Sequence, residues 1–128
     1  MLVKTFGSAV YGVEAITITI EVNVTAGRKY FLVGLPDNAV KESWQRIESA
    51  LKSSGYKMKR LRTVINMAPA DIRKAGSAYD LPIAIGILAA SDQIPGAGLA
   101  RYVIMGELSL DGCVLPIKGA LPSAIQAR

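Results

Sequence analysis

The segment AITITIEVNVT, residues 15–25, decides the fold class of this 128-residue chain. Isoleucine or valine stands at every second position from Ile16 to Val24, and polar residues fill the positions between them. Alternation with a period of two, built on β-branched residues, is typical of a strand with one buried face and one wet face. The segment therefore predicts a long strand at the edge of a hydrophobic core.

The flanks of this strand predict further strands. Upstream, residues 2–6 predict a short strand that is interrupted at Gly7 and Gly12. Downstream, residues 26–28 predict a turn, and the apolar run KYFLVGL (29–35) predicts a strand that pairs back as a hairpin.

A helix and another strand follow. Pro36-Asp37-Asn38 predicts a helix start with Asp37 or Asn38 as the cap, and Gly55 predicts its end. The apolar residues of this helix fall on one face: Val40, Trp44, Ile47 and Leu51. Residues 62–67 predict the next strand, so the order strand, helix, strand suggests a crossover, with a hairpin-like return as the alternative.

The remaining third predicts a buried helix and a hairpin. Asp80 is expected to cap a helix over 81–91, which is apolar nearly all round. Residues 102–105 predict a strand, and 107–115 predict a tight hairpin that turns at Asp111-Gly112. Residues 121–128 have helical spacing over only two turns, too few for a stable helix. We therefore expect a single domain over 1–128 that is a fragment of a longer protein.

Composition excludes several classes. The chain is 51% hydrophobic and 20% charged, as globular domains are. It has no histidine, the commonest zinc ligand and general base, and a single cysteine, Cys113, expected to be an inert buried thiol in a strand. The longest apolar stretch, 81–90, is about half of a membrane span. We expect a cytoplasmic domain without disulfide, metal or membrane contact.

The positive charge is local. The net charge is +5, and residues 52–74 contain seven basic residues against the single acid Asp71. Such a cluster can contact phosphates rather than bases, although it can equally be a solvated surface. Trp44 and Tyr56 bracket the run, but Trp44 shares its helix face with core residues, so packing is favoured over base stacking. The candidate DNA-binding residues are Lys57, Lys59, Arg60, Arg62, Arg73 and Lys74.

No phosphate loop of the form GxxxxGK[ST] is present in the sequence. Gly96-Ala97-Gly98 comes nearest, but no Lys-Ser or Lys-Thr pair follows it. We expect this chain alone not to hydrolyse ATP.

Three motifs carry a resemblance that covers essentially the whole chain. They are NMAPADIRK (66–74), GSAYDLPIA (76–84) and GELSLDG (106–112), and the run GLPD (34–37) with VKES (40–43) agrees with them. Together they resemble the N-terminal domain of the ComM/YifB proteins, the magnesium-chelatase-related AAA+ ATPases of bacteria.

The resemblance implies a fold and a setting. The fold would be α/β (α+β), Lon-protease-like and similar to ribosomal-protein domain 2: a mixed sheet with a long N-terminal hairpin and two or three helices packed on it. An AAA+ module beyond Arg128 would bind ATP and Mg, and no cofactor is expected in this chain. Family members look like hexameric DNA motors, and ComM supports natural transformation by branch migration. The implied partners are the AAA+ module, neighbouring subunits and DNA.

Two alternatives to a non-catalytic DNA-processing domain stay open. Lon proteases use a Ser-Lys dyad, and aligning their motif puts the serine at Ala78 and the lysine near Leu121. Ser77 and Lys118 lie one and three residues early, so the dyad is unmatched unless it is shifted onto them. The chain would then be a Ser-Lys peptidase. The other alternative is a pure oligomerisation module.

Overall fold

The alternating segment forms β2 (Glu14–Ala26), the long strand that the sequence predicts. The computed structural model describes residues 1–11 and 14–117 of the chain. β2 pairs antiparallel with β1 (Leu2–Tyr11) on one side and with β4 (Leu61–Ala68) on the other. β1 runs straight through Gly7 and is therefore longer than the strand expected over 2–6. The two N-terminal strands form the long hairpin of the predicted fold class.

The predicted hairpin between β2 and the following strand is wrong. β3 (Tyr30–Val33) lies beside β4 and runs parallel to it, which gives the sheet order β1-β2-β4-β3. The connection from β3 to β4 is the crossover that the strand, helix, strand order suggested. The hydrophobic pattern could not decide this, because both arrangements bury the same alternate side chains of β3.

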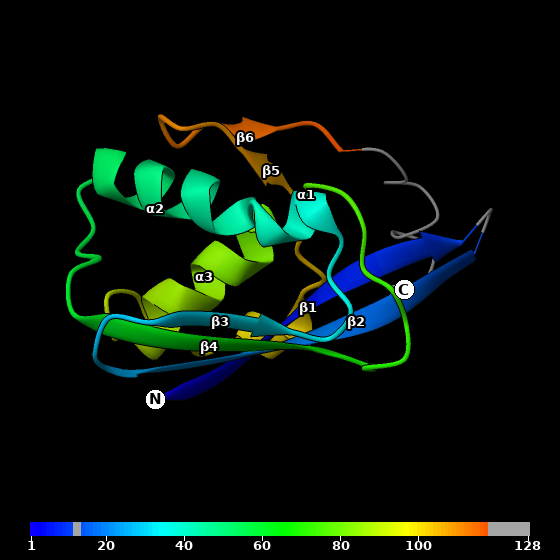
Figure 1. The fold of residues 1–128 in the computed structure, drawn as a ribbon, viewed down its shortest axis with the longest axis horizontal. Coiled ribbons are helices and arrows are strands. Elements are labelled where there is room, and N and C mark those ends of the chain that lie inside the picture. Colours follow the sequence, from blue (N-terminus) through cyan, green and yellow to red (C-terminus); the bar gives the residue numbers. More distant parts are fainter. Residues whose placement is uncertain (12–13, 118–128) are drawn as a thin grey trace.

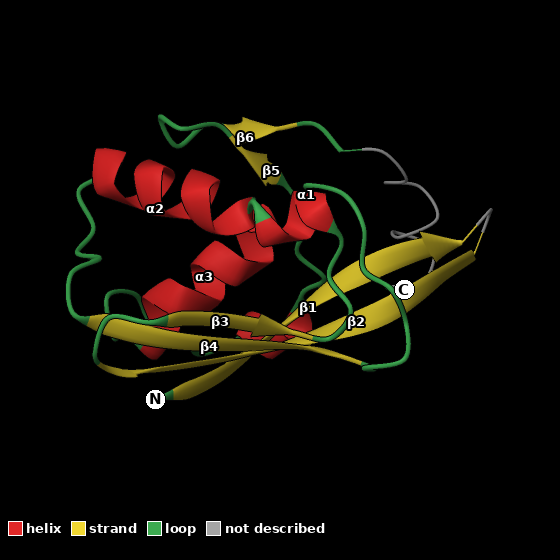
Figure 2. Cartoon of the chain, in the orientation of Figure 1, coloured by secondary structure: helices red, strands yellow, loops and turns green. Residues whose placement is uncertain are grey.

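The helices cover one face of this mixed sheet (Figure 2). α1 (Asn38–Lys41) and α2 (Ser43–Ser53) form the crossover, and α3 (Asp80–Ala90) packs against β1 and β2. Asp37 caps α1 as predicted, since its Oδ1 accepts from the Val40 amide at 2.8 Å. Gly86 lets α3 approach the sheet, because a Cβ there would lie 2.7 Å from a Val22 methyl group. The fully buried core side chains include Ile18, Ile20, Val22, Ile47, Ile65, Met67, Ile83 and Ile87.

A small hairpin closes the described chain above α2 (Figure 1). β5 (Glu107–Leu108) and β6 (Val114–Leu115) pair antiparallel around a turn at Gly112, as expected. The strand expected over 102–105 is reduced to one bridge between Val103 and Phe6, preceded by the short helix η1 (Leu99–Arg101). Cys113 is exposed in this turn, so the prediction of a buried thiol is wrong. The helix expected over 121–128 lies outside the described residues.

The predicted class is confirmed in its coarse form: a mixed α+β domain with a four-stranded sheet, an N-terminal hairpin and helices packed on it. The likeness to the Lon-protease fold and the domain boundary at 1–128 stay predictions. Within the described part of the chain, no helix is both long and apolar enough to cross a membrane.

Asp80 does not cap α3, contrary to the prediction. The N-cap is Tyr79, and the fully buried Asp80 carboxylate instead accepts from Arg46 of α2 at 2.6 and 2.9 Å. It also accepts from the Leu108 amide of β5 at 3.0 Å, while Arg46 donates to the Ala39 carbonyl of α1. Asp80, which the sequence predicts as a helix cap, thus forms a buried ion pair that connects α1, α2, α3 and β5.

We expect Asp80→Ala to lower the free energy of unfolding by about 3–5 kcal/mol, because it leaves the Arg46 guanidinium and the Leu108 amide without their acceptor. Urea denaturation measures this change. The matched control is Glu48→Ala, which breaks the exposed Lys52–Glu48 pair and should change stability by at most about 0.5 kcal/mol. A loss below about 1 kcal/mol for Asp80→Ala would contradict the role assigned to the buried pair.

Candidate nucleic-acid interface

The β2–β3 turn lies beside the start of β4 at one end of the sheet (Figure 1), and both segments carry exposed basic residues. The Gly27 amide donates to the Arg60 carbonyl at 3.1 Å, which joins the two segments. Arg28 and Lys29 of the turn therefore lie beside the segment that carries the predicted basic residues. We call this cluster the basic end; its exposed members are Arg28, Lys29, Lys57, Lys59, Arg60 and Arg62.

The loop from α2 to β4 presents two of these lysines and is held in place by one side chain. Gln93 accepts from the Lys57 amide at 2.7 Å and donates to the Lys57 carbonyl at 2.8 Å. The loop surrounds an open hollow of about 450 Å³, lined by Lys52, Tyr56, Lys57, Met58 and Lys59. The Lys52 ammonium is paired with Glu48 at 3.2 Å, whereas Lys57 and Lys59 have no salt bridge among the described residues. Two such cations beside apolar side chains are suited to an anion with an apolar remainder.

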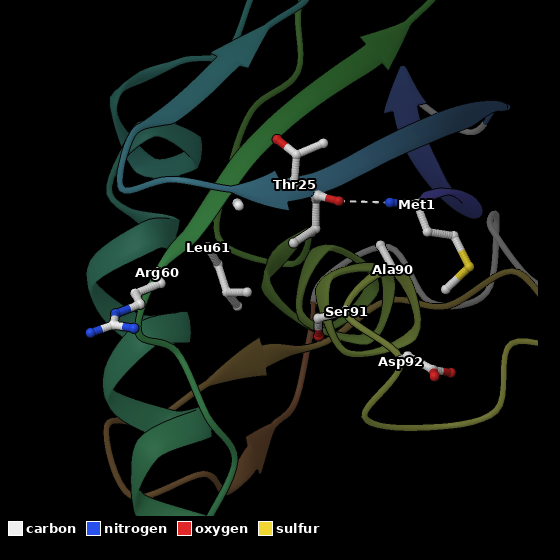
Figure 3. Close-up of a pocket in the computed structure, with 9 residues that line it drawn as sticks. Met1, Thr25, Arg60, Leu61, Ala90, Ser91 and Asp92 are labelled. Atoms are coloured by element: carbon white, nitrogen blue, oxygen red, sulfur yellow. Dashed lines mark hydrogen bonds between the residues drawn. The ribbon is translucent and has the colours of Figure 1, made fainter.

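Arg60 stands at the rim of a second, shallower hollow below the end of α3 (Figure 3). Its backbone is left-handed, with φ 61°, and Asp92, which follows the end of α3, lies on the other side of the hollow. Arg60 is exposed, and its guanidinium points away from the other labelled residues in Figure 3. Besides Arg60, the hollow is lined by Met1, whose ammonium donates to the Val24 carbonyl at 2.6 Å, and by the exposed Asp92, so it adds one charge of each sign.

The charges of the basic end are not neutralised within the described residues. The salt bridges among residues 1–11 and 14–117 join Lys4 to Glu21, Arg46 to Asp80 and Lys52 to Glu48. None of the six members of the basic end takes part in them. An exposed cluster of one sign attracts polyanions and raises the rate at which they associate.

Two of the six predicted residues lie elsewhere. Lys74 is fully buried, with its ammonium donating to the Pro69 carbonyl, and burial lowers its pKa. Lys74 therefore cannot reach a phosphate and is no longer a candidate DNA-binding residue. Arg73 is exposed but follows the opposite end of β4, whose last residue, Ala68, is about 20 Å along the strand from Arg62. Lys57, Lys59, Arg60 and Arg62 remain together.

Sequence reasoning missed Arg28, Lys29 and Phe31. All three precede α2 and are separated from the basic run by the whole crossover. The signal was present in the turn at residues 26–29, which carries two adjacent basic residues. Only the pairing of β4 with β2 and β3 brings that turn to the basic run.

Residues 20–128 match the protein family described as subunit ChlI of Mg-chelatase. The chain belongs to the ChlI family. This match covers well over half of the sequence and includes every member of the basic end.

Relatives of this ChlI-family chain are similar over nearly all of it. An uncharacterized protein YifB of Salmonella typhimurium is 45% identical over 93% of the chain, and competence protein ComM of Haemophilus influenzae is 43% identical over 96%. An uncharacterized Mycobacterium tuberculosis protein is 37% identical over 98%. The chain spans about a quarter of the length of these relatives, 24–25%. The expected resemblance to the N-terminal domain of the ComM/YifB family is thereby confirmed.

Two of the three motifs of this ChlI-family chain, residues 76–84 and 106–112, meet around the start of α3. The Gly106 amide donates to the Ala78 carbonyl at 2.8 Å, and the Leu81 amide donates to the Gly106 carbonyl at 3.0 Å. Ser77 donates its hydroxyl to Glu107, a carboxylate and not an amine. Lys118, the other half of the shifted dyad, lies outside the described residues, so the peptidase alternative stays a prediction.

The described residues do not fit a magnesium site. Across residues 1–11 and 14–117, no three aspartate, glutamate, cysteine or histidine side chains lie close enough to hold a metal ion. No step is therefore derived through magnesium in this chain of the ChlI family.

We expect Gln93→Ala to raise the hydrogen-exchange rate of the Lys57 amide about 5–10-fold, because it removes both bonds that hold the loop. Exchange followed by NMR measures the rate at this single position. Gln45→Ala, an exposed glutamine of α2, is the matched control and should leave the Lys57 amide unchanged. Unchanged protection in Gln93→Ala would show that the loop does not depend on this clamp.

Proposed function

We propose that this chain is a non-catalytic domain of a magnesium-chelatase-like AAA+ ATPase that processes DNA, and that its basic end contacts DNA phosphates. In the full-length protein, an AAA+ module elsewhere in the sequence would bind ATP and Mg and drive a hexamer in the cytoplasm. The process would be branch migration during transformation, as the resemblance to ComM implies. The ATPase module and the neighbouring subunits would be the protein partners.

One observation carries the DNA-contact part of this proposal. Six exposed basic side chains from two separate segments meet at one end of the sheet, and none has an ionic partner among the described residues. Long flexible cations with free ammonium or guanidinium groups suit phosphates, which carry no sequence information. The similarity to a competence protein also supports the proposed contact with DNA.

We expect the double variant Lys59→Gln, Arg60→Gln to bind duplex DNA more weakly, with the slope of log K against log salt reduced by about 1.8, because each lost phosphate contact removes about 0.9. Fluorescence anisotropy across a salt series measures the slope. The charge-matched control is Lys41→Gln, Arg101→Gln, which changes two exposed cations of α1 and η1. Equal losses in both variants, or no binding by the unmodified chain at low salt, would contradict the proposed contact.

An assembly role is the second candidate, and the β5–β6 hairpin favours it. Leu110 and Val114 are 59% and 56% exposed, and Leu115 adds to the same hairpin. Apolar side chains that gather at an exposed hairpin are typical of a surface that packs against another domain or subunit. This role is compatible with the DNA contact, because the hairpin and the basic end belong to different parts of the fold.

We expect Leu110→Ser, Val114→Ser in the full-length protein to shift the oligomer to smaller species, since the variant removes apolar contact area. Light scattering coupled to size exclusion measures the mass. Val10→Ser, Tyr102→Ser alters two exposed apolar residues on other elements and is the control. A hexamer that survives the hairpin variant would exclude the hairpin as an assembly surface.

A further inference from the structure

The outer face of the four-stranded sheet carries an aromatic side chain beside a cation. In the described structure, α2 and α3 both lie on the opposite face (Figure 2). Phe31 of β3 is 41% exposed on the outer face, and the Arg62 guanidinium lies 5.2 Å from its ring centroid. Base stacking was not favoured for Trp44, which lies on the helix face with core residues, but Phe31 and Arg62 bring an aromatic ring and a cation together on an exposed strand face.

The strand register places this pair within rows of side chains that cross the sheet. Phe31 lies opposite Val64, which in turn lies opposite Asn23. The neighbouring row, one step toward the basic end, contains Arg62 and Thr25. The outer face therefore presents a flat apolar spot at Phe31, short polar side chains next to it, and cations at one border.

The acid on this face is already occupied. Glu21 accepts from the Asn66 amide group at 2.8 Å and lies 4.0 Å from the Lys4 ammonium. Its negative charge is therefore offset on the sheet itself, so that it opposes a polyanion less than an unpaired carboxylate would. The field over the outer face is set by Arg62 and the adjoining basic end.

We propose that the outer face of the sheet binds single-stranded DNA, with a base stacked on the Phe31–Arg62 pair and the adjoining phosphates on the basic end. This inference rests on the proposed phosphate contact and adds the form of DNA that is preferred. Duplex bases are stacked on one another and cannot reach a ring on a flat sheet, whereas bases of a single strand can. Aromatic and guanidinium planes on strands are the surfaces on which such bases stack.

The experiment compares two probes on the 128-residue chain: a labelled oligothymidylate of about 15 nucleotides and a duplex of the same length. We expect Phe31→Ala to weaken binding of the oligothymidylate about 5–150-fold, the range for one lost base stack, and to leave duplex binding unchanged. Phe31→Trp should retain the affinity. Tyr102→Ala removes an aromatic that is 64% exposed and follows η1, away from the Phe31–Arg62 pair, and should change neither affinity.

The outcomes separate this inference from the function on which it rests. Salt-dependent duplex binding together with an oligothymidylate affinity that Phe31→Ala does not change would overturn the stacking site and leave the phosphate contact intact. Absence of binding to both probes at low salt would overturn both. Circular dichroism of Phe31→Ala should match the unmodified chain, since the ring is partly exposed, and the Phe31→Trp variant tests the site independently of that check.

Discussion

The buried ion pair between Asp80 and Arg46 is the constraint on which the arrangement of the helices depends. Removing a carboxylate from water costs several kcal/mol, so its acceptor positions have to be filled. Here the Arg46 guanidinium of α2 and the amide of Leu108 fill these acceptor positions. Arg46 also donates to the Ala39 carbonyl of α1. Burial and the nearby Asp80 charge raise the pKa of Tyr30, whose ring stacks on Trp44 at 4.3 Å. The Asp80–Arg46 pair and the apolar core thus favour the same packing of the helices.

In the described structure, this packing leaves the other side of the sheet and one of its ends without a covering helix. α3 and α2 cover the face that carries the isoleucines and valines of β2, so the opposite face carries the threonines of β2, Asn23 and Arg62. The crossover brings the chain back beside the β2–β3 turn, and the Gly27–Arg60 hydrogen bond fixes the two basic segments together. The proposed phosphate surface and the proposed stacking surface then adjoin without any rearrangement of the core.

Local signals predicted the local elements well. The period-two alternation gave β2, Asp37 gave the start of α1, and the Asp111-Gly112 turn gave the small hairpin. Long-range partners were harder: the position of β3, the buried role of Asp80 and the burial of Lys74 all depend on residues far away in the sequence. A lysine in a charged run looks exposed until its strand bridge and its carbonyl acceptor are known. For the same reason the sequence did not predict Phe31, Arg28 and Lys29 as site residues, because only strand pairing brings them close to the basic run.

The strand order has a consequence for the growing chain on the ribosome. The β1–β2 hairpin can close once Ala26 has emerged, but the second edge of β2 waits for β4, which ends only at Ala68. Through that interval of synthesis a long strand rich in isoleucine and valine has an open edge that can pair with other chains. Glu21 places a charge between Ile20 and Val22 on this strand, and a charge at such a position opposes aggregation during the delay, before the fold is complete.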